Sequence, residues 1–178
     1  LDAATVLGTM PNIPANRVHS QFDLGGPGFT VSAEENSGLA ALALAARALR
    51  HGALDACVVG AVDACAEPVH ERAMRELRGD TRPSGDAAVA MVLMREGNAR
   101  AAGRPVLAVV DESAAPTLAL GDGATELTEL FGRPHAAVGL LHAAAGVVAL
   151  QHGAKPSLTA RTQPDAWTGV RAVRVTSR

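Results

Sequence analysis

The stretch FTVSAEENSGLAALALAARALR at residues 29–50 decides the fold of this chain of 178 residues. A short β-type run at residues 29–31 leads through a polar turn with Glu34 and Glu35 into a nearly all-apolar segment at residues 37–50. Because the apolar residues recur at helical spacing, we predict a strand, a tight turn and a buried helix that ends at His51 and Gly52. The positions expected on its buried face are Leu39, Leu42, Ala46 and Leu49, with Ala43 packed closely beside them.

The start of this helix is a candidate site. Free N–H groups at a helix N-terminus carry a partial positive charge, and enzymes place nucleophiles or bound anions there. This chain places the two carboxylates Glu34 and Glu35 there. Acidic residues in a first turn also simply complement the helix dipole, and the local sequence favours that plainer interpretation.

The flanking segments alternate between strand and helix patterns. Residues 67–84 and 113–123 are expected to be irregular or loop-like. The alternation of the remaining segments predicts an α/β fold. Helices are expected at residues 10–23, 126–130 and 136–152, and strands at residues 57–62, 87–94, 106–110 and 170–176.

Composition and motif content exclude several classes of protein. Sixteen basic residues against eighteen acidic ones argue against nucleic-acid binding, and 48% apolar residues argue against disorder. No uncharged apolar run is long enough for a membrane span. Cys57 and Cys65 are roughly 26 Å apart on an extended strand, too far for a disulfide, so a cytoplasmic location is expected. No metal-ligand or nucleotide-binding spacing occurs, so we expect no metal and no bound cofactor.

Several segments, taken in order, resemble the β-ketoacyl synthases, the condensing enzymes of polyketide and fatty-acid synthases. They are MPNIPANRV at residues 10–18, FDLGGPGFTV at 22–31, GALDACVVGAV at 52–62, GDAAVAMVL at 85–93, and GRPHAAVG at 132–139 with VALQHG at 148–153. The resemblance implies a thiolase-like fold with layers in the order α-β-α-β-α, here truncated. Residues 1–178 are expected to form one ketosynthase-like domain, a fragment of a larger synthase. The resemblance also implies that residues 57–62 lie near a dimer seam.

The same resemblance places the family's catalytic positions on residues of a different chemistry. Aligned from Phe29, the nucleophilic Cys falls on Glu35, and aligned back from Gly153, one catalytic His falls on Arg133. The other catalytic His has no counterpart, and the Gly-Asp-Gly run at residues 121–123 only echoes its Gly-Thr-Gly segment. No catalytic residue is therefore intact, and Glu35 and Arg133 are expected to be close, with Glu35 ionised.

Residues 31–37 most resemble the inactive partner called chain-length factor. That implies a non-condensing subunit that pairs with an active ketosynthase, or with itself as a dimer, and shapes the acyl tunnel in polyketide or fatty-acid biosynthesis. Its substrates are expected on the phosphopantetheine arm of an acyl carrier protein. Two alternatives stay open: a decarboxylase of malonyl-type carrier-protein thioesters, and a purely structural docking domain of a megasynthase.

Overall fold

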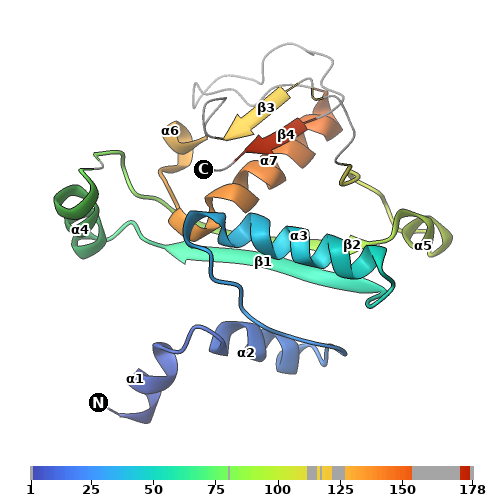
Figure 1. Ribbon diagram of the computed structural model, residues 1–178, viewed down its shortest axis with the longest axis horizontal. Coiled ribbons are helices and arrows are strands. Elements are labelled where there is room, and N and C mark those ends of the chain that lie inside the picture. The colour runs from blue at the N-terminus through green and yellow to red at the C-terminus, as the bar shows by residue number, and fades with distance from the viewer. Residues whose placement is uncertain are drawn as a thin grey trace. The chain divides into compact units, whose positions relative to one another are not determined.

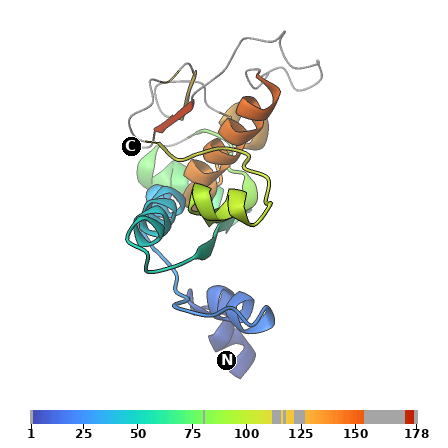
Figure 2. The same cartoon turned by 90° about the vertical axis from the view of Figure 1, so that its right-hand side faces the viewer.

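The computed structural model describes residues 2–79, 81–111, 116, 118–121, 127–153 and 173–176. These residues belong to two units, Leu1–Ser32 and Ala33–Arg178. Figure 1 shows the elements of both units and Figure 2 the same ribbon turned by 90°, so that α3 is seen nearly along its axis.

The first unit consists of two short helices and a loop that folds back onto them. Helix α1 (Ala3–Gly8) begins at Asp2, whose carboxylate accepts a hydrogen bond of 2.8 Å from the Thr5 amide. Helix α2 (Ile13–Gln21) lies within the predicted helix at residues 10–23. After it, the hydroxyl of Thr30 donates to the Pro11 carbonyl at 2.9 Å.

The second unit is built around an antiparallel strand pair covered by a helix. Strands β1 (Ala56–Ala64) and β2 (Asp86–Met94) confirm the strands predicted at residues 57–62 and 87–94. Helix α3 (Ser37–Arg50) has the predicted bounds and lies along β1 (Figure 1). Alternate strand residues face the helices and form one apolar cluster, with Val59 paired in register with Met91.

A second helix joins this sheet to another strand pair. Helix α7 (Val138–His152) contacts α3, β2 and the parallel pair of β3 (Leu118–Gly121) and β4 (Val173–Thr176). Leu118 and Leu120 pack against Ala149 of α7 in a separate apolar cluster. The helices are therefore a layer that touches both sheets, which corresponds to the central β-α-β part of the five layers expected from the resemblance. The described part of β4 lies within the strand predicted at residues 170–176, and residues 170–172 lie outside the described ranges.

The first turns of α3 and α7 touch through a reciprocal pair of glycines. A Cβ atom on Gly38 would lie 2.9 Å from Cβ of Leu140, and one on Gly139 would lie 2.6 Å from Cγ of Leu39. Each glycine thus makes room for the leucine of the opposite helix. A short 3₁₀ turn precedes each helix: η1 (Glu34–Asn36) before α3 and η2 (His135–Ala137) before α7.

Several predictions about secondary structure are wrong. Residues 67–84 were expected to be irregular, but they include helix α4 (Pro68–Arg78). The Glu67 side chain caps the start of this helix by accepting from the Val69 amide at 2.9 Å, and Gly79, in a left-handed conformation, ends it. Residues 29–31 and 106–110 form no strand, because an apolar run becomes a strand only beside a partner and none lies beside them among the described residues. Conversely, β3 occupies part of the expected loop at residues 113–123, because β4 pairs with it. Two further short helices are α5 (Glu96–Ala101) and α6 (Thr128–Phe131), the latter where a short helix was predicted.

The buried face of α3 differs in part from the predicted one. Leu49 is buried as predicted, but Leu39, Leu42 and Ala46 are half-buried, and Gly38 and Ala45 are buried instead. Ala43 is exposed, so its expected close packing is wrong. It lies two residues from Ala45, which is about 200° around the helix. None of the described helices is long and apolar enough to cross a bilayer.

We predict that Ala45→Leu destabilises the protein by about 1–3 kcal/mol, because Ala45 is 7% exposed and packs against Val59 and Leu140. Ala43→Leu is the matched control on the exposed side of the same helix and should change the free energy of unfolding by less than about 0.5 kcal/mol. Urea denaturation of both variants measures the difference. Equal losses would contradict this assignment of the buried face.

Candidate functional site

The turn before α3 presents two carboxylates from a constrained backbone. The Ser37 hydroxyl accepts from the Ala33 amide at 2.9 Å and donates to the Glu34 carbonyl at 2.6 Å, which closes the turn. Glu34 has a φ angle of 51°, a left-handed conformation that is unusual for a residue with a side chain. Glu35 lies in η1, immediately before α3, as the sequence predicts.

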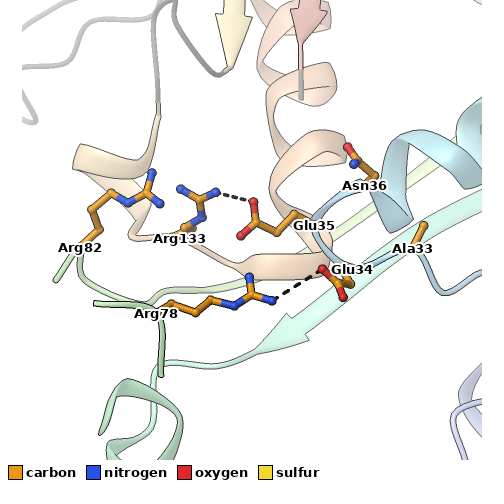
Figure 3. Close-up of a pocket in the computed structure, with 7 residues that line it drawn as sticks. All are labelled: Ala33, Glu34, Glu35, Asn36, Arg78, Arg82 and Arg133. Atoms are coloured by element: carbon orange, nitrogen blue, oxygen red, sulfur yellow. Dashed lines mark hydrogen bonds and ion pairs between the residues drawn. The ribbon is translucent and has the colours of Figure 1, made fainter. Parts of the chain in front are cut away.

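Arg133 meets Glu35 in a buried ion pair, as Figure 3 shows. The Arg133 Nη2 atom donates to Glu35 Oε2, and the two side chains are 9% and 20% exposed. The expected proximity of these two residues is therefore confirmed. Buried charges are tolerated when each is compensated in this way, and leaving one unpaired is costly.

The backbone around Arg133 is held by a close crossing with the segment that enters β2. Ser84 and Arg133 form a parallel bridge, in which the Arg133 amide donates to the Pro83 carbonyl at 2.9 Å. A Cβ atom on Gly85 would lie 1.9 Å from the Phe131 carbonyl oxygen, so only glycine fits there. This crossing aims the Arg133 side chain at η1.

Neither cysteine is an activated nucleophile. Cys65 is buried, and the carbonyls of Gly85 at 3.1 Å and Arg133 at 3.3 Å share its single S–H donor, so it helps to hold the crossing. Burial, with a smaller contribution from the Asp63 carboxylate, raises the pKa of the Cys65 thiol. Burial also raises the pKa of Cys57. Because the thiolate is the reactive form, both groups are less reactive than a free cysteine at neutral pH.

The buried histidine His142 has a structural role. Its Nε2 atom accepts from the Leu127 amide at 3.2 Å, which leaves the proton on Nδ1 to be donated to the Val138 carbonyl at 2.9 Å. His142 is 3% exposed and is not among the residues that line the pocket beside Glu35 and Arg133. Of the Gly-Asp-Gly run expected to echo a histidine segment, Gly121 ends β3, and Asp122 and Gly123 lie outside the described residues.

The ion pair borders a pocket of about 800 Å³ (Figure 3). Three guanidinium groups and two carboxylates line it, so its chemistry is that of ion pairing. The sequence did not single out Arg78 and Arg82, because they come from the segment expected to be irregular. The caps of α4, with Glu67 before it, Pro68 as its first residue and Gly79 after it, are the signal that places Arg78 at the end of this helix. The lining residues are Ala33, Glu34, Glu35, Asn36, Arg78, Arg82 and Arg133.

The side chains of the described residues show no arrangement typical of a metal centre. They contain no group of three or more His, Cys, Asp or Glu side chains arranged to hold a metal ion. The pocket at η1 offers guanidinium and carboxylate groups from opposite sides, which suits an anion or an ion pair better than a cation.

Comparisons of sequence give one consistent family. The family described as "Beta-ketoacyl synthase, N-terminal domain" matches residues 1–99. The chain is 32% identical over 123 aligned residues to the highly reducing polyketide synthase sdnO of Sordaria araneosa, and the match covers 61% of this chain and 4% of that protein. It is 36% identical over 123 residues to the polyketide synthase GfsA of Streptomyces halstedii, 61% of this chain and 2% of the relative. The chain thus matches a few per cent of the length of these relatives.

Solved structures confirm the predicted thiolase-like α/β fold. The ketosynthase from module 6 of the bacillaene synthase of Bacillus subtilis 168 superimposes with a TM-score of 0.71 at 16% identity, covering 98% of this chain and 46% of that one. The oxazolomycin ketosynthase domain OzmH KS7 of Streptomyces albus JA3453 gives a TM-score of 0.68 at 20% identity, covering 93% and 44%. The chain spans less than half of each of these two structures.

Gln keeps the size and an acceptor oxygen of Glu35, which by itself favours tolerance of Glu35→Gln. Because the substitution leaves the buried Arg133 guanidinium without its counter-charge, we instead predict a loss of about 3 kcal/mol in stability. The double variant Glu35→Leu with Arg133→Met removes both charges and should recover most of that loss. Urea denaturation measures both effects.

The matched control is Glu96→Gln. Glu96 pairs with Arg100 on α5, and both side chains are well exposed, so its loss should cost no more than about 0.5 kcal/mol. If Glu35→Gln costs as little as Glu96→Gln, the pair between Glu35 and Arg133 does not have the stabilising role given to it here.

Proposed function

Since the chain belongs to the β-ketoacyl synthase family, we propose that it is a ketosynthase-like region that does not itself condense acyl groups and that pairs with an active ketosynthase. In this role it shapes the acyl tunnel of that partner in polyketide or fatty-acid biosynthesis, and the substrates arrive on the phosphopantetheine arm of an acyl carrier protein. The observation that carries the proposal is the buried ion pair between Glu35 and Arg133.

The chemistry of that pair opposes condensation. A condensing enzyme needs a thiolate that takes the acyl chain as a thioester, and imidazole groups that assist decarboxylation and hold the developing enolate oxygen. At the position that the resemblance gives to the thiol stands Glu35, whose acyl adduct would be a hydrolytically labile mixed anhydride. Arg133 stands at one imidazole position and stays protonated at neutral pH, so it does not shuttle protons.

An exposed apolar sheet face supports the pairing part of the proposal. The residues of β1 and β2 that point away from α3 include Val58, Val62 and Val92, which are 48%, 64% and 73% exposed within the described residues. Contiguous apolar patches of this kind mark interaction sites. Val58 and Val62 of this face belong to residues 57–62, which the resemblance places near a dimer seam.

A second candidate is decarboxylation of malonyl-type carrier-protein thioesters. The three arginines that line the pocket favour it, because guanidinium groups bind carboxylates well. Release of carbon dioxide from malonyl carrier protein separates the two candidates: release by this chain alone, lost in Arg133→Met, supports the decarboxylase.

The non-condensing role predicts that incubation with acyl thioesters leaves no stable acyl adduct on Glu35. It also predicts that Glu35→Cys alone produces no condensation, because neither imidazole role is restored. Intact-protein and peptide mass spectrometry measure the adduct, and product analysis with malonyl carrier protein measures condensation. A stable adduct on Glu35, or condensation by the single variant, would overturn the proposal.

The pairing role predicts that an active ketosynthase binds this chain through the exposed sheet face. Val92→Arg should abolish binding in sedimentation velocity, since a charge on this face would be buried without a partner. The matched control is Val69→Arg on α4, where Val69 is 75% exposed and belongs to a different surface. Binding that survives Val92→Arg would contradict the proposed surface, and self-association without ketosynthase binding would identify a homodimer instead.

A further inference from the structure

The pocket at η1 contains a second ion pair of a different kind from the buried one. Arg78, the last residue of α4, faces Glu34 with 3.7 Å between Nη2 and Oε2. Their side chains are 51% and 77% exposed. Figure 3 shows this pair on one side of the pocket and the pair of Glu35 and Arg133 on the other.

A ligand can replace one partner of the exposed pair of Arg78 and Glu34, but not of the buried pair of Glu35 and Arg133. Exposed ion pairs contribute little, because water and salt compete for both charges. The separation of 3.7 Å is also beyond hydrogen-bond distance, so Glu34 does not engage the donors of the Arg78 guanidinium. Glu34 is held at this place by the left-handed turn before α3, and its contact with Arg78 is incidental to that turn.

We infer that Arg78 binds the carboxylate of a small ligand in this pocket, whose wall also carries Arg82, and that Glu34 is the internal group that this ligand displaces. A guanidinium binds a carboxylate through two parallel N–H donors when the ligand is free to align, and Glu34 does not reach that geometry here. This inference rests on the proposed function, in which the pocket serves no condensation, and adds the ligand class of the same pocket.

Charge in the pocket favours a carboxylate over a phosphate. The wall already holds the carboxylates of Glu34 and Glu35, which repel the charge that a phosphate concentrates on one group more strongly than the single charge of one carboxylate. In a dicarboxylate the second charge lies at the far end of the ligand, away from these two side chains. A carboxylate also has the planar pair of oxygens that Glu34 itself offers to Arg78. A ligand with one or two carboxylates and no phosphate group therefore fits the site best.

The test is calorimetric titration of the whole chain with succinate at constant ionic strength. We expect saturable binding that Arg78→Gln weakens by about fivefold or more and that Glu34→Gln strengthens by about twofold to fivefold, the range for an exposed ion pair. Arg100→Gln and Glu96→Gln, which break the exposed pair on α5, are matched controls and should leave the affinity unchanged. Succinamide, the neutral analogue, should not bind.

Each other outcome counts against the inference. No saturable binding, or an affinity that Arg78→Gln leaves unchanged, would overturn the site. Inorganic phosphate binding more tightly than succinate would overturn the ligand class, and weaker binding by Glu34→Gln would make Glu34 part of the site instead of its competitor. Condensation by the unaltered chain would overturn the proposed function alone, because the titration involves no thioester.

Discussion

The contact between the first turns of α3 and α7 is the constraint on which the rest of the second unit depends. Gly38 admits Leu140 and Gly139 admits Leu39, so the two helices approach more closely at their starts than side chains at those glycines would permit. Because a 3₁₀ turn precedes each helix, the approach also brings the residues just upstream together. Glu35 in η1 and Arg133 before η2 become neighbours although 98 residues separate them in the chain.

The end of β1 stabilises the same junction from the side of the sheet. The Asp63 carboxylate accepts from the Ala136 amide at 2.9 Å at the start of η2, and the Cys65 thiol bonds the Arg133 carbonyl. These bonds satisfy polar groups that would otherwise be buried without partners at the helix start. The strand thus supports α3 through apolar contacts along its length and positions Arg133 through polar contacts at its end.

The local part of this architecture could be predicted and the long-range part could not. The helix at residues 37–50 was predicted correctly because its apolar residues recur at helical spacing and its ends are clear. The strands β1 and β2 were predicted correctly because each is an apolar run that has the other as its partner. Residues 106–110 have the same apolar character but no neighbouring strand among the described residues, and sequence alone does not show a missing partner. Glu35 and Arg133 were found through the family resemblance. Arg78 was missed because its role depends on where α4 ends in space.

In the proposed non-condensing role, a carboxylate and a guanidinium take the positions that the family resemblance gives to a thiol and an imidazole, and this changes what the junction can do. A nucleophile and a base must each stay available to a substrate, whereas Glu35 and Arg133 pair with one another and are mostly buried. The helix start that would activate a nucleophile here stabilises an anion that is already paired. Ligand binding in the pocket therefore falls to the exposed groups, because the contact between Arg78 and Glu34 is weak enough for a ligand to replace it.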